Sequence, residues 1–182
     1  MTLRNSAEGF GLISRLLHWA MAAGMLGTIA LGLSLARTQP SLSNIWLFSL
    51  HKTIGITLLT LAVARLLWHR VSPPPPPLPG PPGWQMALAR WVHRALYTLM
   101  IVLPLAGWAG SAATGIDVVV FGRWVLPGLV PATEANAEGF LRLHYVLAFA
   151  LIGLLSLHVA GALRRAAKRD GSLRRMLLGT RK

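Results

Sequence analysis

Apolar residues are gathered into four long runs, and polar or proline-rich stretches separate them. The runs extend over about residues 16–35, 46–68, 91–111 and 143–163. A helix needs about 20 mostly apolar residues to cross the hydrocarbon core of a membrane. The pattern therefore predicts an all-α integral membrane four-helix bundle, and we expect residues 1–182 to form a single domain.

The connections between the runs are poor candidates for membrane-spanning helices. Residues 37–44 form a short polar link, and residues 71–83 contain PPPPPLPGPP, which cannot be helical because proline lacks the backbone donor and clashes with the preceding turn. Residues 112–139 contain VVVFGRWVLPGLV, which we interpret as an interfacial segment because glycine and proline interrupt it. A signal peptide is the alternative for the first run, but its apolar stretch is longer than the usual core of about 7–15 residues.

The composition excludes an ordinary soluble domain. Hydrophobic residues make up 54% of the chain and charged residues 13%, whereas a soluble domain carries about 25% charged residues. The net charge of +13 would suggest nucleic-acid binding in a soluble protein. In a membrane protein it sets the orientation instead, so we expect a lipid bilayer and no nucleic acid as partner. The absence of cysteine excludes disulfides, thiolate metal sites and c-type haem attachment.

Lys and Arg residues are concentrated on one side of the predicted bundle. Only Arg37, Lys52, Arg123 and Arg142 lie on the side of the two polar links. Cytoplasmic loops of membrane proteins carry the excess of Lys and Arg, so the distribution predicts that both termini are cytoplasmic in a multi-pass protein of the bacterial inner membrane. The cations on the predicted cytoplasmic side are Arg4, Arg15, Arg65, Arg70, Arg90, Arg94, Arg164, Arg165, Lys168, Arg169, Arg174, Arg175, Arg181 and Lys182.

Two histidines of the fourth run lie on one face of the predicted helix. Ionisable residues inside a span are costly and by default indicate function. His144 and His158 are fourteen residues apart, which corresponds to about 21 Å along a helix and a difference of about 40° in direction. One helix would therefore present two imidazoles on the same face, one near each membrane surface.

Each of these imidazoles needs a partner at its own depth. His51 is the candidate on the periplasmic side, and His18, His93 and His69 compete on the cytoplasmic side. Two imidazole pairs at two depths of a helical bundle are what two bis-histidine b-type haems require. The alternative is that these histidines form hydrogen bonds between helices, and we interpret His69 as an interfacial histidine.

Two further residues could contact such haems. Arg65 follows His51 by fourteen residues, so it points the same way at the depth of the inner pair and could bind a haem propionate or extend to the interface. Gly55 lies one turn after His51, where a missing side chain would let a porphyrin approach the helix. Ordinary packing of small residues between helices explains Gly55 equally well.

Sequence motifs occur in order along nearly the whole chain. They are RLLHW (15–19), HKTIG (51–55), RLLWHR (65–70), LARWVHRALY (88–97), PLAGW (104–108), LHYVLA and LHVAGAL in the fourth run, and DGSLRRML (170–177). By these motifs the chain resembles the prokaryotic cytochrome b561 family, relatives of the cytochrome b subunits of Ni–Fe hydrogenase and formate dehydrogenase. The resemblance implies a membrane cytochrome with two b haems that exchanges electrons with ubiquinone or another quinone.

The resemblance also implies which histidines bind iron. The cytoplasmic haem would be held by His18 and His158, and the periplasmic haem by His51 and His144. His93 would then hold no iron, and together with Arg90 it is a candidate for a quinone site near the cytoplasmic haem.

The preferred hypothesis is an electron carrier between a periplasmic donor and membrane quinone. Lys52 adjoins His51, and Arg142 precedes His144 by two residues, so a positive mouth over the outer haem could steer an anion inward. Together with the resemblance, this makes superoxide a candidate donor and superoxide:ubiquinone oxidoreduction the candidate activity. Anchoring of helix ends at the interface explains the two cations equally well.

Two other hypotheses stay open. The chain could be the membrane anchor and quinone-reducing cytochrome b subunit of a hydrogenase- or dehydrogenase-like complex, with a redox protein as donor. It could also be a histidine-lined metal transporter without haem, which an absorption spectrum would distinguish at once.

Overall fold

The computed structural model describes residues 2–179. Arg181 and Lys182, counted above among the cytoplasmic cations, lie outside the described residues. Within that range the chain forms four long helices, one short helix and a two-stranded sheet. The elements are α1 (Leu12–Leu35), α2 (Ile45–Val71), α3 (Gly83–Ala113), β1 (Val118–Val120), β2 (Trp124–Leu126), α4 (Glu134–Ala167) and α5 (Ser172–Leu178).

The four long helices are long and apolar enough to cross a membrane, which confirms the four predicted runs. However, α3 and α4 contain 31 and 34 residues and begin well before the apolar stretches that predicted them. The start of α4 is fixed by Thr133, whose side chain accepts a hydrogen bond from the backbone N–H of Asn136, a normal N-cap. The apolar runs thus report the part of each helix that crosses the hydrocarbon, and the helices extend beyond it.

Exposed tryptophans lie near both ends of the long helices. Trp19, Trp84 and Trp91 are exposed at the end of the molecule that carries the termini, and Trp46 and Trp124 at the opposite end. Tryptophan is enriched at the two membrane–water interfaces because its ring is apolar and its N–H is polar. These two groups of rings therefore indicate the levels of the two interfaces.

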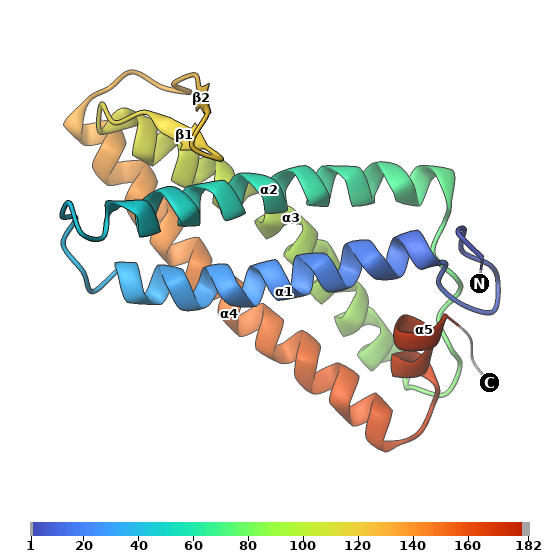
Figure 1. Cartoon of the computed structure of the whole chain (residues 1–182). Coiled ribbons are helices and arrows are strands. Elements are labelled where there is room, and N and C mark those ends of the chain that lie inside the picture. Colours follow the sequence, from blue (N-terminus) through green and yellow to red (C-terminus); the bar gives the residue numbers. More distant parts are fainter. Residues whose placement is uncertain (1, 180–182) are drawn as a thin grey trace.

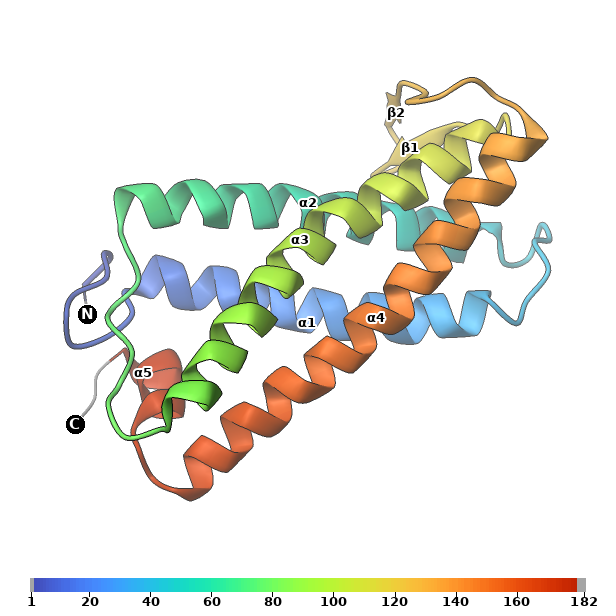
Figure 2. The ribbon, with the colours of Figure 1, turned by 180° about the vertical axis from the view of Figure 1, so that it is seen from behind.

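The helices are arranged as two antiparallel hairpins. One hairpin consists of α1 and α2, the other of α3 and α4, and the two hairpins cross at a pronounced angle (Figure 1, Figure 2). All four helices contribute to the core, in which Ala62 is fully buried and its small side chain lets the helices approach closely. The buried core residues are Met21, Met25, Leu58, Ala62, Leu99 and Leu151.

A small antiparallel sheet lies between α3 and α4 in the sequence. Val118 and Val120 of β1 are buried, β1 packs against α2, and the backbone N–H of Phe121 donates a hydrogen bond to Thr53 Oγ1 (3.3 Å). Phe121 and Trp124 are exposed. This agrees with the prediction that the segment does not cross the membrane. The two short strands were not predicted.

Both termini lie at the same end of the molecule (Figure 1). There, the side chain of Arg175 in α5 is buried and contacts two other parts of the chain. We call Arg175 and its contacts the terminal clasp. Its guanidinium donates hydrogen bonds to the carbonyl oxygens of Ala7 (2.9 Å), Glu8 (2.7 Å) and Pro76 (3.0 Å). The N-terminal segment, the proline-rich loop and α5 are thereby held together.

We expect Arg175→Ala to open the terminal clasp. The substitution removes charge-assisted hydrogen bonds to part-buried carbonyls, which costs about 2–4 kcal/mol. The purified variant should melt at a lower temperature, and protease should cut its N-terminal segment faster. The exposed neighbour Arg174 provides the matched control as Arg174→Ala, and equal melting temperatures for the two variants would contradict the role of Arg175.

Candidate functional site

The structure brings four histidines together in two pairs. The ring centroids of His51 and His144 are 6.1 Å apart, and those of His18 and His158 are 6.3 Å apart. In each pair α4 supplies one ring, and α2 or α1 supplies the other. The two pairs are separated by fourteen residues of α4, which is about 21 Å along the helix.

These separations fit two imidazoles on opposite sides of one metal ion. A metal–imidazole bond is about 2 Å and a ring nitrogen lies about 1 Å from the ring centroid, so two such ligands have centroids about 6 Å apart. Both pairs match this value. Two nitrogen donors per site are the donor set of a bis-histidine haem.

Hydrogen bonds position both rings of the outer pair. His144 Nδ1 donates to the carbonyl oxygen of Leu103 (2.9 Å), and His51 Nδ1 lies within 3.4 Å of Thr28 Oγ1. A carbonyl can only accept, so Nδ1 of His144 carries the proton and Nε2 keeps its lone pair. Such a contact fixes the tautomer of a metal-ligating histidine.

Two glycines make room for the rings of the outer pair. A Cβ atom at Gly107 would lie 2.7 Å from His144 Nδ1, and one at Gly32 would lie 3.0 Å from His51 Cε1. Sequence reasoning missed both residues because neither is near its histidine along the chain. It selected Gly55 instead, where a Cβ would meet nothing within 4 Å, so contact of Gly55 with a porphyrin stays a prediction.

The inner pair has a cation beside it. Arg65 is buried, and its Nη1 donates a hydrogen bond to His18 Nδ1 (3.0 Å), while its guanidinium lies 5.8 Å from the centre of the Tyr97 ring. Among the described residues, Arg65 Nε has no hydrogen-bond partner. Because His18 Nδ1 accepts here, binding of a metal through Nε2 requires the proton to move to Nδ1. Arg65 would then lose this acceptor and be available to an anionic group.

The other two histidines on this side are in different surroundings. His93 is exposed, its ring lies 5.0 Å from that of His158, and its Nδ1 donates to the carbonyl oxygen of Ala89 (2.7 Å). That separation is shorter than two ligands on one metal require, so the geometry favours His18 as the partner of His158. Arg90 is exposed one turn before His93, and the half-buried His69 lies against Tyr97 at 6.0 Å.

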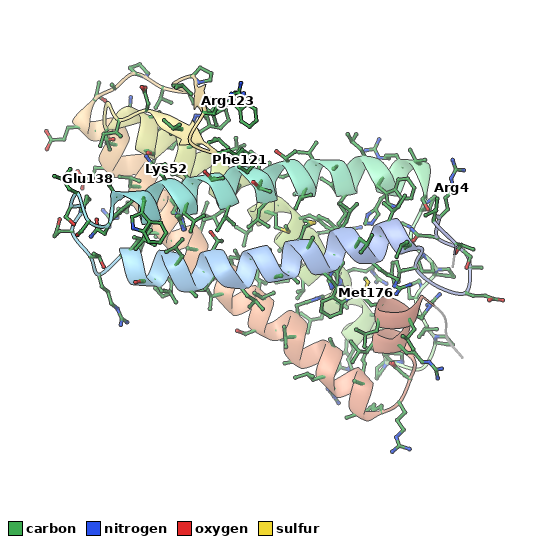
Figure 3. All side chains as sticks on the ribbon, in the orientation of Figure 1. Arg4, Lys52, Phe121, Arg123, Glu138 and Met176 are labelled. Atoms are coloured by element: carbon green, nitrogen blue, oxygen red, sulfur yellow. The ribbon has the colours of Figure 1, made fainter. Side chains whose placement is uncertain are left out.

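The two cations predicted to steer anions lie on different helices at the level of the outer pair. Lys52 is half-buried on α2, and Arg142 is exposed on α4. Figure 3 shows Lys52 and Glu138 at the end of the molecule opposite Arg4 and Met176. Glu138 is exposed one turn before Arg142, and an opposite charge at this spacing weakens the local positive potential.

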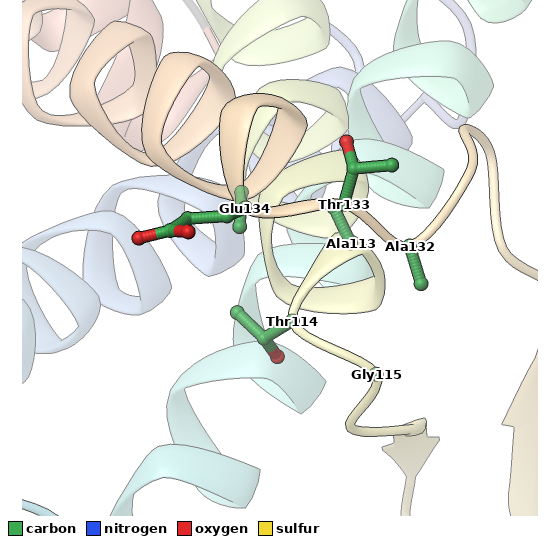
Figure 4. A pocket seen from close by; sticks show the side chains of 7 residues that line it. Ala113, Thr114, Gly115, Ala132, Thr133 and Glu134 are labelled. Atoms are coloured by element: carbon green, nitrogen blue, oxygen red, sulfur yellow. The ribbon is translucent and has the colours of Figure 1, made fainter.

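A hollow at this end lies away from the histidines. It has a volume of about 480 Å³ and lies between the end of α3 and the start of α4 (Figure 4). Its lining includes Ala137, about two turns before His144. Within residues 2–179, no group of three or more His, Asp or Glu side chains is arranged to hold a metal ion.

Comparisons with known proteins assign this four-helix chain to a family. The family model described as prokaryotic cytochrome b561 matches residues 9–179. The chain belongs to the prokaryotic cytochrome b561 family. Membership implies haem b, and with the four spanning helices it makes the chain a multi-pass protein of the bacterial inner membrane.

Three relatives illustrate the range of similarity. "Cytochrome b561 homolog 2" of Escherichia coli (strain K12) is 35% identical over 97% of this chain and 95% of the relative. "Cytochrome b561 homolog 1" of the same organism is 32% identical over 88% of this chain and 92% of the relative. "Probable superoxide oxidase CybB" of Yersinia pestis is 30% identical over 72% of this chain and 75% of the relative.

We expect Gly107→Ala to lower the haem content of the purified protein. The added methyl group would press on the His144 ring and turn it away from His51, and overpacking of this kind costs about 1–3 kcal/mol. The ratio of Soret absorbance to protein measures the loss. Gly153→Ala on the exposed face of α4 is the matched control because nothing lies within 4 Å of its Cβ. Equal haem loading in both variants would contradict the steric role of Gly107.

Proposed function

We propose that residues 1–182 form one di-haem b-type cytochrome domain that carries electrons across the inner membrane from a periplasmic donor to quinone. The observation that carries the proposal is the pair of imidazole sites held at two depths by a single helix. The excess of Lys and Arg at the end with the terminal clasp supports cytoplasmic termini. On this orientation the His51–His144 pair faces the periplasm.

Each haem is assigned to one histidine pair. His18 and His158 would hold the inner haem, and His51 and His144 the outer one. A haem held by two histidines would supply one-electron transfer, and a donor such as superoxide would give up its electron without binding the iron. Arg65, released from His18 when that ring binds iron, would pair with an inner-haem propionate through charge-assisted hydrogen bonds.

The apolar core lies between the two proposed haem sites. Met25 of α1, Leu58 of α2 and Leu151 of α4 are buried at intermediate depth. These side chains exclude water along the path between the sites, so an electron crosses without solvent having to reorganise around it. Quinone would bind near the inner haem, where two electrons, from two donor ions, and two protons from solvent would reduce it to quinol. The exposed Arg90 would hold a quinone oxygen, and the exposed His93 would relay the protons.

Superoxide is the proposed donor. The support is the name of the Yersinia pestis relative, a probable superoxide oxidase, together with Lys52 and Arg142 at the level of the outer pair. These cations would raise the local concentration of a small anion, and Glu138 limits the effect. The proposed activity is therefore superoxide:ubiquinone oxidoreduction. If purification from the native membrane instead yields a stoichiometric iron–sulfur or hydrogenase-like partner, the chain is the quinone-reducing subunit of a complex.

The haem count tests the ligand assignment. We expect the pyridine haemochrome spectrum to give two b haems per chain, and His→Ala at position 18, 51, 144 or 158 to remove one haem each, because an iron with one axial histidine is held weakly. His69→Ala should keep both haems. A colourless protein under ample haem supply would overturn the proposed function, and haem loss in His93→Ala with retention in His18→Ala would reassign the inner ligand.

Charge reversal at Lys52 tests the donor. We expect Lys52→Glu to lower superoxide-driven quinone reduction several-fold while haem content stays unchanged, and the wild-type rate to fall as ionic strength rises, since salt screens steering. Arg37→Glu, on the same side of the membrane but outside the helices, is the control. A rate that is independent of salt and of Lys52 would argue against an anionic donor.

A further inference from the structure

A second hollow lies at the end of the molecule that carries the termini. It has a volume of about 180 Å³ and lies between the proline-rich loop, at residues 79–81, and the last turn of α4. This is room for several water molecules or for one polyatomic anion. Its charged lining consists of Arg164, Arg165, Lys168 and Asp170.

The one acidic residue in this lining, Asp170, already has partners within the chain. Asp170 forms an ion pair with Arg165 Nε, and its second oxygen accepts a hydrogen bond from the backbone N–H of Ser172 (2.9 Å). Burial raises the pKa of Asp170, but the hydrogen bonds from Ser172 and Arg165 outweigh it and hold the pKa below its ordinary value. The carboxylate therefore stays charged at neutral pH and holds Arg165 in place.

The cations around the hollow have N–H groups that form no hydrogen bond or ion pair with the described residues. Arg165 Nη2 is buried and has no hydrogen-bond partner among the described residues. Arg164, in the last turn of α4, and Lys168, which directly follows the helix, form no ion pair within residues 2–179. A buried donor without an acceptor costs about 1–3 kcal/mol, so Arg165 Nη2 favours an acceptor in the hollow. The exposed Arg164 and Lys168 add positive charge beside it, and together the three cations suit an anion with several oxygens.

The surroundings indicate where this anion comes from. Pro79 and Pro81 in the facing loop carry no N–H, and the neutral donors in the lining belong to Gly80 and Gln85. The positive charge of the hollow therefore comes from the cations at the end of α4. Leu157 and Leu163, in the turns of α4 just before the cations, are exposed, and side chains at this depth face lipid tails. A ligand with a charged head and apolar chains would satisfy both regions.

We propose that this hollow binds the phosphate group of an anionic phospholipid, with Arg164, Arg165 and Lys168 as its ligands and the acyl chains along α4. Basic pockets at the cytoplasmic ends of membrane helices suit such headgroups. The proposal depends on the α4 terminus and the proline-rich loop alone, so it is independent of the haem assignment.

Native mass spectrometry of delipidated protein in neutral detergent tests the site. Phosphatidylglycerol and phosphatidylcholine with the same acyl chains are titrated separately, and inorganic phosphate is added as a competitor. We expect selective binding of phosphatidylglycerol, and we expect Arg164→Gln with Lys168→Gln to weaken it about tenfold or more, as loss of charge-assisted hydrogen bonds requires. The control is Arg169→Gln with Arg174→Gln, which changes the same charge on exposed residues outside the hollow.

Three results would overturn the lipid site. They are equal binding of the two lipids, equal weakening by both double variants, and full displacement of phosphatidylglycerol by millimolar inorganic phosphate, which would assign the hollow to free phosphate. Arg164 and Lys168 are exposed, so both double variants should melt like the wild-type protein and keep its haem content. Should the first double variant fail to fold, Arg164→Gln alone is expected to give a partial loss of selectivity.

Discussion

The arrangement of this protein depends on placing four imidazoles in two pairs between membrane-spanning helices, and on hydrogen bonds that orient the rings of the outer pair. Charged or unpartnered groups are costly there, so each ring needs a partner that fixes its proton. For His144 that partner is the carbonyl of Leu103 on α3, and for His51 it is Thr28 on α1. All four helices are thereby tied to the histidine pairs, and the apolar core fills the depth between the two levels.

The spans and the histidine stripe could be predicted because few other structures explain apolar runs of that length and because helix geometry fixes the relative direction of His144 and His158. The starts of α3 at Gly83 and α4 at Glu134 could not be predicted, since hydropathy reports what lies in hydrocarbon and not where the helix begins. The strands of three residues are too short for a periodic pattern to show.

The residues that surround the histidine rings could not be predicted from the sequence for a different reason. Gly107 and Gly32 contact histidines on other helices, and such contacts depend on how helices pack and not on local sequence. Spacing placed Arg65 at the correct depth, but only the coordinates show that its present acceptor is His18 Nδ1. Depth along a helix can be predicted from sequence, whereas these contacts depend on how the two helices of each hairpin pack against one another.

The inner histidine pair has a buried cation beside it, whereas the hydrogen bonds of the outer pair go to a carbonyl and a hydroxyl. Unit charges about 21 Å apart interact by only about 0.8 kcal/mol at an effective dielectric constant of about 20, so one site barely influences the other. Arg65 is much nearer to the inner pair, within 3.0 Å of His18. A buried cation there favours the electron-rich form of whatever the inner pair binds, whereas the outer rings are held by a carbonyl and a hydroxyl. On the proposed function, Arg65 would offset the negative charge of an inner-haem propionate, and this would favour electron movement from the outer site to the inner one. The separation of the sites alone would give the electron no preference.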